Sequence, residues 1–321
     1  MAPFLAPRAA PAAGSDPAGV RPRTAGYLLV AAAAVLGATI VTVGAQEKPG
    51  RASESRTRDV YASVLDNKGR PVAGLGAADF VVKEDGVARE VLKAGPATGA
   101  LAVAVTVDDS QASTPFMQFI RDGLSDFIKK LDGKAQIALS TFGERPTPLV
   151  EYTDNAAALQ KGVTRLFAKN GAGSYFLEAM VELSRGLERR ETARKAIVAI
   201  IIENGPEFSN LYYARVLEDL KRSGATLHVL AVGAPAGNDS DELRNRNTVM
   251  AEGTSLTGGR RDQILAESGI DERLVQLADE LTNQYVITYA RSDKLIPPEK
   301  LDVSVSKPGI VVRAPKRLPG K

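Results

Sequence analysis

The chain contains no cysteine and no tryptophan, and it has a single histidine, His228, among its 321 residues. The lack of cysteine excludes disulfides, thiol catalysis and thiolate metal sites. One histidine argues against a histidine-based catalytic triad and against a zinc site with several histidine ligands. Because His228 lies inside an expected strand, we interpret it as a half-buried structural residue.

Several motifs of common enzyme classes are also missing. No junction between an expected strand and an expected helix carries the glycine-rich patterns that bind dinucleotides or nucleoside triphosphates. No GxSxG nucleophile elbow is present. The 41 basic and 38 acidic residues nearly balance, so the charge gives no reason to expect a nucleic-acid surface. We expect neither a nucleotide-dependent enzyme nor a nucleic-acid-binding protein.

The first 45 residues have the character of an export segment. Residues 1–26 are rich in Ala, Pro and Gly and are expected to be disordered. Residues 27–45 form an uncharged apolar run that follows basic residues and ends in small ones, which predicts a signal peptide cut before Gln46. A retained anchor is the alternative, and the chain would then meet a membrane only through residues 27–45. Residues 46–57 are a polar linker, and export to the periplasm, cell envelope or medium is expected.

Residues 58–98 are expected to form a small β unit of two hairpins. Their apolar and polar side chains alternate, and Asp85-Gly86 supplies a hairpin turn. Near the C-terminus, residues 300–306 and 309–314 predict another hairpin-like pair within a terminal segment, 291–321. Since two hairpins bury little by themselves, this pair is expected to complete the same β unit.

Residues 99–290 alternate between strand and helix patterns. This alternation predicts an α/β domain with a doubly wound, mostly parallel sheet. The expected strands are residues 101–108, 135–142, 148–152, 195–203, 225–233 and 284–290. The expected helices are residues 115–131, 155–168, 175–188, 209–222 and 271–282. Residues 234–269 are long and polar and are expected to be a functional or mobile loop.

Oxygen-bearing side chains follow the first strand of this domain. The apolar run from residue 101 stops at Asp108, Asp109, Ser110 and Ser113. In sheets of this kind, ligands bind beyond the carboxyl ends of the strands. The loops at residues 171–174 and 203–205 are expected at the same edge, and carboxylate and hydroxyl oxygens are the ligands that Mg²⁺ and Ca²⁺ prefer.

The order of elements and these three loops resemble a von Willebrand factor A domain. That family builds a metal-ion-dependent adhesion site from Asp-x-Ser-x-Ser, a distal Thr and a distal Asp. The flanking segments GRPVAGLGAADFVVKEDG and NQYVITYARSDK, and the tail LDVSVSKPGIVVRAP, resemble the exported von Willebrand A-related proteins of Acidobacteria. The resemblance covers about residues 58–315. It implies an exported protein-interaction module of the adhesion or scaffold type that is not an enzyme.

The adhesion site is only partly matched. Asp108 and Ser110 fall on the first two ligands, whereas the second serine falls on Ala112. Ser174 stands where the family has Thr, and Asn204 stands where it has Asp. Because affinity for a divalent cation depends on the number and charge of the ligands, we expect weak binding of Mg²⁺ or another divalent cation, or none.

A protein partner of unknown identity is expected at the same edge. The residues predicted to contact it are Asp109, Ser113, Tyr212 and Tyr213. Three alternatives stay open. Asp108 and Ser110 could simply cap the helix that begins near Pro115. The chain could be an envelope scaffold that binds through its β units, or a hydrolase that uses Asp108 and Asp109 as acid and base.

Overall fold

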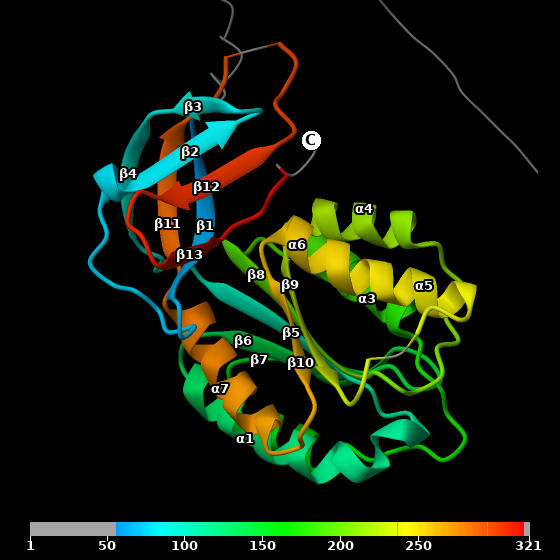
Figure 1. Ribbon diagram of the computed structural model, residues 1–321. Coiled ribbons are helices and arrows are strands. Elements are labelled where there is room, and N and C mark those ends of the chain that lie inside the picture. The colour runs from blue at the N-terminus through cyan, green and yellow to red at the C-terminus, as the bar shows by residue number, and fades with distance from the viewer. Residues whose placement is uncertain (1–55, 236, 294, 318–321) are drawn as a thin grey trace, which may run out of the picture. The chain divides into compact units, whose positions relative to one another are not determined.

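The computed structural model describes residues 56–235, 237–293 and 295–317 (Figure 1). These residues belong to one compact unit that begins at Ala52. Within the described ranges, no helix has the length and apolar character that a membrane span requires. The predicted signal peptide or anchor at residues 27–45 lies outside them, as does nearly all of the linker.

A six-stranded sheet forms the centre of the α/β part, in the order β10-β9-β8-β5-β6-β7. All neighbouring strands run parallel except β7, which is antiparallel to β6. The strands are β5 (Leu101–Val107), β6 (Gln136–Thr141), β7 (Thr147–Thr153), β8 (Arg194–Ile202), β9 (Thr226–Val232) and β10 (Arg260–Ile264). Every residue of β5 is buried because helices cover both faces of the sheet. The expected doubly wound fold is confirmed.

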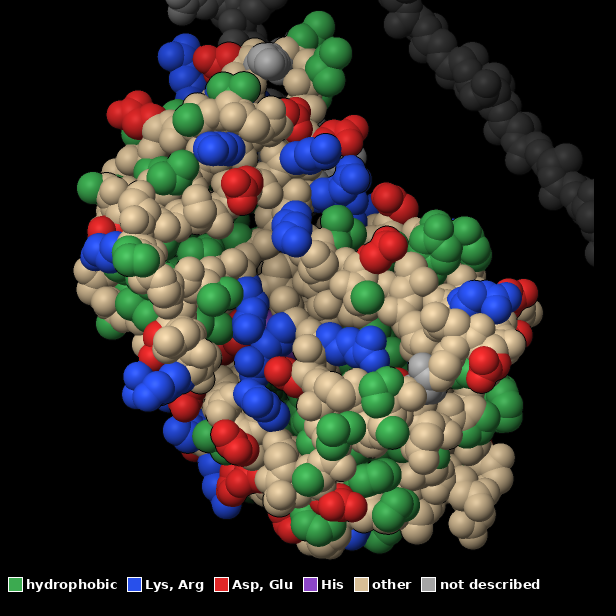
Figure 2. All heavy atoms as spheres, in the orientation of Figure 1, with side chains coloured by type: hydrophobic (Ala, Val, Ile, Leu, Met, Phe, Trp, Pro, Cys, Tyr) green, Lys and Arg blue, Asp and Glu red, His purple; other side chains and the backbone are tan. Residues whose placement is uncertain are grey.

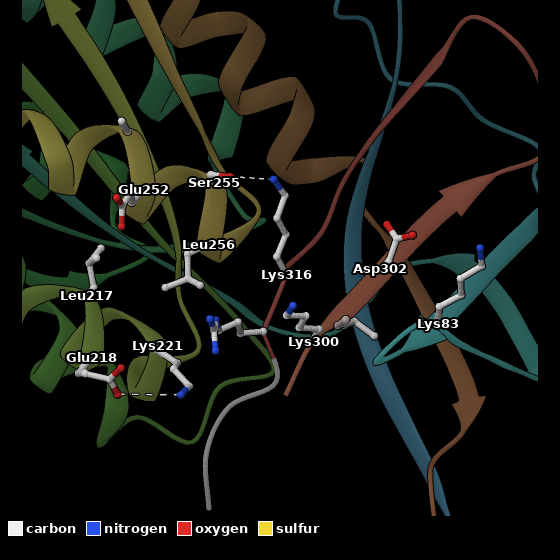
Figure 3. A pocket seen from close by; sticks show the side chains of 14 residues that line it. Lys83, Leu217, Glu218, Lys221, Glu252, Ser255, Leu256, Lys300, Asp302 and Lys316 are labelled. Carbon is white, nitrogen blue, oxygen red and sulfur yellow. Dashed lines mark hydrogen bonds and ion pairs between the residues drawn. The ribbon is translucent and has the colours of Figure 1, made fainter. Parts of the chain in front are cut away.

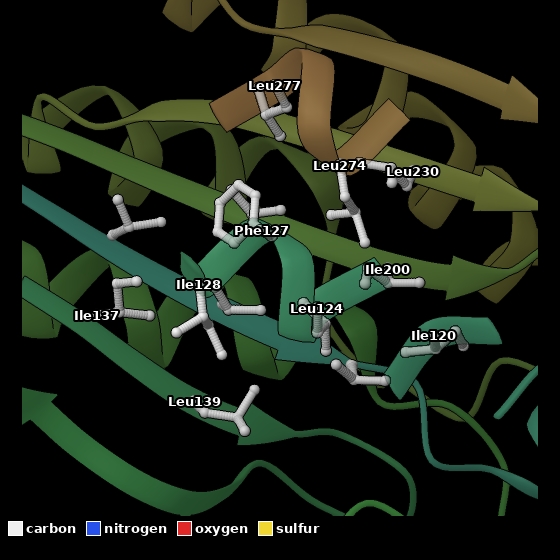
Figure 4. Close-up of a cluster of buried hydrophobic side chains, with 14 of the residues drawn as sticks. Ile120, Leu124, Phe127, Ile128, Ile137, Leu139, Ile200, Leu230, Leu274 and Leu277 are labelled. Carbon is white, nitrogen blue, oxygen red and sulfur yellow. The ribbon is translucent and has the colours of Figure 1, made fainter. Parts of the chain in front are cut away.

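Helices lie on both faces of this sheet (Figure 1). On one face lie α1 (Met117–Leu131), α2 (Ala156–Val163) and α7 (Gly269–Thr282). On the other lie α3 (Phe176–Glu188), α4 (Tyr213–Ser223), α5 (Asp241–Thr248) and α6 (Thr254–Thr257). Leu124, Phe127 and Ile128 of α1 are buried with Leu274 and Leu277 of α7 (Figure 4). The helical spacing of their apolar residues produces this contact, and the five helices expected from that spacing are confirmed.

The two ends of the described chain together form the small β unit. It contains β1 (Thr57–Asp66), β2 (Phe80–Glu84), β3 (Val87–Arg89), β4 (Val91–Pro96), β11 (Tyr285–Ala290), β12 (Leu301–Val305) and β13 (Ile310–Arg313). One sheet has the order β13-β1-β11-β4 and the other β12-β2-β3, and the two share one apolar core. The β2–β3 turn at Asp85 and Gly86 is confirmed, with both residues at positive φ. The α/β part is therefore inserted between β4 and β11.

Three pairing expectations were wrong. Of the two hairpins expected in residues 58–98, only the one formed by β2 and β3 is present, because β1 pairs with β11 and β13. The strand expected at residues 284–290 of the α/β domain is β11, which pairs with β1 and β4 of the small unit. Its burial alternates along the strand, as in a sheet with only one face covered. The predicted pairing of residues 300–306 with 309–314 is also wrong, because β12 pairs with β2 and β13 pairs with β1. The C-terminal segment does complete the small unit, but by adding one strand to each sheet.

The segment 234–269 was expected to be a long loop, and this was wrong. It contains α5, a π-helical turn (Val249–Gly253), α6 and the edge strand β10. Ser240 caps α5 by accepting a hydrogen bond from Leu243 N at 3.2 Å. The polar composition of α5 concealed this helix, because Arg246 is its only buried residue.

Candidate functional site

Asp108 lies at the point where the strand order reverses, between the carboxyl ends of β5 and β8. Its side chain is fully buried. Oδ1 accepts a hydrogen bond from Ser110 N at 2.9 Å, and Oδ2 accepts one from Ile202 N at 3.2 Å. Burial raises the pKa of Asp108, and these hydrogen bonds oppose that rise. Asp108 thus ties the loop after β5 to the end of β8.

The other three predicted site residues that follow β5, Asp109, Ser110 and Ser113, are buried as well. Asp109 Oδ1 accepts a hydrogen bond from Gly143 N at 2.6 Å, and its Oδ2 pairs with Lys169 Nζ at 3.0 Å. Ser113 Oγ donates to Ser110 O at 2.7 Å. Ser110 Oγ is buried and has no hydrogen-bond partner among the described residues. Asp109 and Ser113 were predicted to contact a partner, but in this conformation they support the loop from inside.

The two adjacent carboxylates face different neighbours. Asp108 is held by the backbone at the end of β8, whereas Asp109 is held by Gly143 and Lys169. A general acid and a general base must both reach one substrate. The arrangement therefore gives no support to the acid and base pair that the sequence left open.

Ser174 and Glu207 join two loops at the same edge. Ser174 Oγ donates to Glu207 Oε2 at 3.0 Å, while Phe176 N and Ser209 N donate to Oε1 at 3.1 and 3.3 Å. Burial raises the pKa of Glu207 to about 7, against the effect of these contacts. Glu207 was missed in the sequence because it stands three residues beyond the position expected to bind metal. It takes the hydroxyl proton of Ser174, the residue that was predicted to offer its oxygen to an ion.

The side chain of Arg246, on α5, is fully buried against the loop that follows β8. Its Nη2 donates to Glu203 O at 3.0 Å and lies 3.6 Å from Glu203 Oε2. Its Nη1 donates to Gly205 O at 3.4 Å. Burial lowers the pKa of Arg246, and the negative charges of Glu207, Glu203 and Asp108 raise it again. The guanidinium is therefore paired with Glu203, and the charges of Glu207 and Asp108 act on it without direct contact.

Asn204 differs in burial from the other predicted metal ligands. Its side chain is exposed, and its Oδ1 lies 3.6 Å from where a Cβ on Gly233 would be, at the end of β9. Asp108, Ser110 and Ser174 are buried at the edge, where Asp108 accepts two backbone hydrogen bonds and Ser174 donates its hydroxyl proton to Glu207. Across the part of the chain that the structure describes, no three His, Cys, Asp or Glu side chains are grouped to hold a metal ion. With one carboxylate among them and with Asn204 exposed, these four residues do not supply the number and charge of oxygen ligands that a divalent cation requires.

Large apolar side chains stand exposed around this edge. We use the term rim for Phe208, Tyr212 and Leu265, which are 51%, 61% and 73% exposed. The Phe208 ring packs edge-on against Tyr175, with centroids 6.1 Å apart. Tyr213, predicted as a partner contact with Tyr212, is only half-buried, and its ring centroid lies 4.4 Å from that of Tyr212. Sequence reasoning identified the tyrosines, but not Leu265.

A groove of about 830 Å³ lies elsewhere, between the small β unit and helices α4 and α6 (Figure 3). Lys316 Nζ donates to Ser255 Oγ at 2.7 Å, and Lys221 lies 4.0 Å from Glu218. Basic side chains outnumber acidic ones along this junction on the face shown in Figure 2. The backbone of Lys316 also donates to Leu256 O at 2.9 Å. These contacts hold the C-terminal segment against α6. We therefore interpret the groove as the packing boundary between the small β unit and the α/β part, and not as a binding site.

Comparisons with known proteins give similarity at the level of fold. No family model matches the chain, and no curated protein matches it. A von Willebrand factor type A structure from Catenulispora acidiphila is 14% identical, with a TM-score of 0.48, over 83% of this chain and 75% of that one. The conserved hypothetical protein BatB from Bacteroides thetaiotaomicron is 14% identical, with a TM-score of 0.44, over 56% and 98%. The von Willebrand domain of the pilus tip protein Mfa5 from Porphyromonas gingivalis is 11% identical, with a TM-score of 0.43, over 57% and 95%.

Proposed function

We propose that this von Willebrand A-like chain is an exported protein-interaction module that is not an enzyme. Its partner binds at the carboxyl edge of the central sheet, on the rim formed by Phe208, Tyr212 and Leu265. The observation that supports this most is the exposure of three large apolar side chains in the segments that follow β8 and β10, at the carboxyl edge of the sheet where ligands bind in such folds. Export is inferred from residues 27–45, and N-terminal sequencing of the mature protein tests it.

The rim has the character of a binding surface because its side chains are exposed while their supports are buried. Clusters of exposed apolar groups on a soluble protein mark interaction sites, and aromatic side chains carry much of the binding energy. Beneath them, Asp108 ties the loop after β5 to the end of β8, and Glu207 ties its loop to Ser174 and to the start of α3. A partner would therefore meet a surface with little conformational freedom to lose, which favours binding.

A photo-crosslinking amino acid at position 212 in the native envelope tests this proposal. We expect a discrete adduct whose yield falls several-fold when Phe208→Ala is added, since neighbouring aromatic residues in a binding surface act together. The matched control is the same amino acid at position 119 of α1, where Phe119 is 44% exposed away from the rim. Equal labelling from positions 212 and 119 would refute the proposal.

A second candidate function is supported by exposed apolar side chains on the small β unit. Leu295 and Ile296 are 99% and 81% exposed, and Val87, Leu92 and Val311 are each 47% exposed. These residues support the alternative of an envelope scaffold that binds through its β strands. A photo-crosslinker at position 295 distinguishes the two candidates: a discrete adduct there, with none from position 212, would favour the scaffold.

Gly173→Ala is expected to disturb the rim at little cost in stability. A Cβ at this position would lie 2.3 Å from the Phe208 ring, and all three of the nearest atoms belong to that ring. Because Phe208 is half exposed, the ring can swing outward, and the free energy of unfolding should change by less than about 1 kcal/mol. Denaturation together with crosslinking from position 212 checks this. Unchanged crosslinking would show that the position of Phe208 is irrelevant to the partner.

A further inference from the structure

We infer that the guanidinium of Arg246 replaces the divalent cation at the carboxyl edge of the sheet. It neutralises the carboxylates there and cross-links the backbone of the loop after β8, which are the structural tasks that a bound ion would perform. The consequence that partner binding needs no metal rests on the proposed function. The replacement itself does not, and it can be tested without a partner.

The first line of support is the position of the guanidinium. Arg246 is fully buried, and its two terminal nitrogens donate to the carbonyls of Glu203 and Gly205, on either side of Asn204. A Cβ at Gly205 would lie 3.7 Å from Ser110 Oγ, so this loop is packed against the loop that follows β5. Arg246 therefore fixes the backbone at the position where the resembling family places its distal acidic ligand.

The second line of support is the charge balance. Asp108, Glu203 and Glu207 are all buried at this edge, and each acts on the charge of Arg246. Buried carboxylates need a positive partner, because their desolvation is otherwise very costly. Arg261 supplies a second positive charge by pairing with Glu203 from the outer side. With two guanidiniums present, a further dication would face repulsion rather than an unoccupied acidic site.

The third line of support is that Arg246 is held in place by the elements around it. Helix α5 is capped by Ser240, and Asn245 Oδ1 accepts a hydrogen bond from Tyr213 N at 3.1 Å, at the start of α4 beside the rim. A π-helical turn, Val249–Gly253, follows directly. Turns of this kind often occur where a helix has to direct a functional side chain. The arginine thus has a fixed position that does not depend on a ligand.

Titration of the full chain with Mn²⁺, followed by electron paramagnetic resonance, tests the inference directly. We expect no stoichiometric binding to the wild type in the millimolar range, and no rise of its melting temperature with Mg²⁺ or Mn²⁺. Stoichiometric Mn²⁺ binding with submillimolar affinity, lost in Asp108→Ala, would overturn the inference. This measurement involves no partner, so it stands whether or not the rim proves to be a binding surface.

Substitution of Arg246 gives the complementary test. We expect Arg246→Ala to lower the melting temperature by about 10 °C, since removing one partner leaves buried carboxylates unpaired. Millimolar guanidinium ion or Mn²⁺ should recover part of that loss. Arg244→Ala is the matched control, because Arg244 is exposed on the same helix and its side chain has only local partners, the Asp241 carboxylate and the Asn238 carbonyl. It should behave like the wild type with and without either ion.

Two outcomes of the substitution experiment would contradict the inference. One is a loss in Arg246→Ala no larger than in Arg244→Ala, and the other is the same recovery by either ion in both variants. If Arg246→Ala does not accumulate as folded protein, Arg246→Lys replaces it. Lysine keeps the charge but cannot donate to both carbonyls, so an intermediate loss is expected.

Discussion

Gly259→Ala is expected to lower the free energy of unfolding by more than about 4 kcal/mol, enough to prevent folding of the α/β part in many backgrounds. A Cβ on Gly259 would lie 1.8 Å from the carbonyl oxygen of Leu227 and 2.5 Å from its carbonyl carbon. Both atoms belong to the backbone of β9, so no side chain can rotate to make room. The chain can cross here only with a hydrogen atom in place of a side chain.

The close contact between Gly259 and the backbone of Leu227 matters because it determines where β10 begins. Gly258 ends α6 in the left-handed region, and Gly259 N donates to Thr254 O at 2.9 Å. Leu227 N in turn donates to Thr257 Oγ1 at 2.9 Å. If Gly259 moves away from Leu227, these contacts and the parallel pairing of β10 with β9 are lost together.

Chemical denaturation of Gly259→Ala and Gly186→Ala measures this effect. Gly186 lies inside α3, and a Cβ there would meet nothing within 4 Å. Alanine at that position should therefore stabilise the protein by about 0.5 to 1 kcal/mol through helix propensity. A loss below about 1 kcal/mol in Gly259→Ala would mean that the approach of the two backbones is not rigid.

Acidification is expected to act on two buried groups in opposite directions, and the first is His228. Burial lowers the pKa of His228 to about 4, and Glu280 of α7, Arg260 of β10 and Arg313 of β13 face it. The unfolded chain takes up the proton near pH 6.5, whereas the folded chain does so only near pH 4. Stability from this group is therefore complete at pH 7 and falls by about 3 kcal/mol as the pH drops from about 6.5 to 4.

Glu207 should produce the reverse slope. Its pKa is raised to about 7 in the folded chain, whereas an unfolded glutamate ionises near 4.5. Between these values the folded state holds a proton that the unfolded state has released, so stability falls as the pH rises. The expected loss is about 3 kcal/mol between pH 4.5 and 7, close in size to the gain from His228 over the same interval.

Variants separate these two contributions. Glu207→Gln should gain stability relative to the wild type as the pH rises from 4.5 to 7, because the amide cannot ionise. His228→Leu should lose the acid sensitivity assigned to the imidazole, since leucine has no charge to bury. Urea denaturation at several pH values between 4 and 8 measures both differences. Parallel pH profiles for the wild type and both variants would contradict the assignment.

Much of the fold could be predicted from hydrophobic pattern because most elements are buried in a regular way. Strand β8 is buried except at Lys195 and so forms a nearly continuous apolar run, and α1 buries one stripe at helical spacing, so both patterns are visible in the sequence. Helix α5 shows none, since Arg246 is its only buried residue, and β11 could not be assigned to a sheet by its own residues. Strand pairing depends on contacts between distant segments, which a local pattern does not contain.

The candidate site was predictable in place but not in composition. Asp108 and Ser110 could be placed at the carboxyl edge of the sheet because they directly follow a predicted strand, and ligands bind beyond the carboxyl ends of strands in this topology. Glu203 was noticed only as part of the loop after β8, and Glu207 and Arg246 were not recognised. Nothing in the sequence shows that a carboxylate three residues past Asn204 bonds to Ser174, or that an arginine on α5 turns inward. These are pairings of buried charges, and they become visible only when distant loops are brought together.

The insertion of the α/β part between β4 and β11 also determines how mechanical force would pass through the molecule. Pro96 of β4 pairs with Tyr285 of β11, and Ala97 N donates to Gln284 O at 2.8 Å, so the two connections run side by side. The N-terminal residue of β1, Thr57, pairs with the last residue of β11, Ala290. Tension between the rim and the N-terminal side would pull β1 and β11 lengthwise in opposite directions. Their hydrogen bonds would be loaded in shear and would have to break together rather than one after another. This pairing is therefore expected to resist mechanical unfolding.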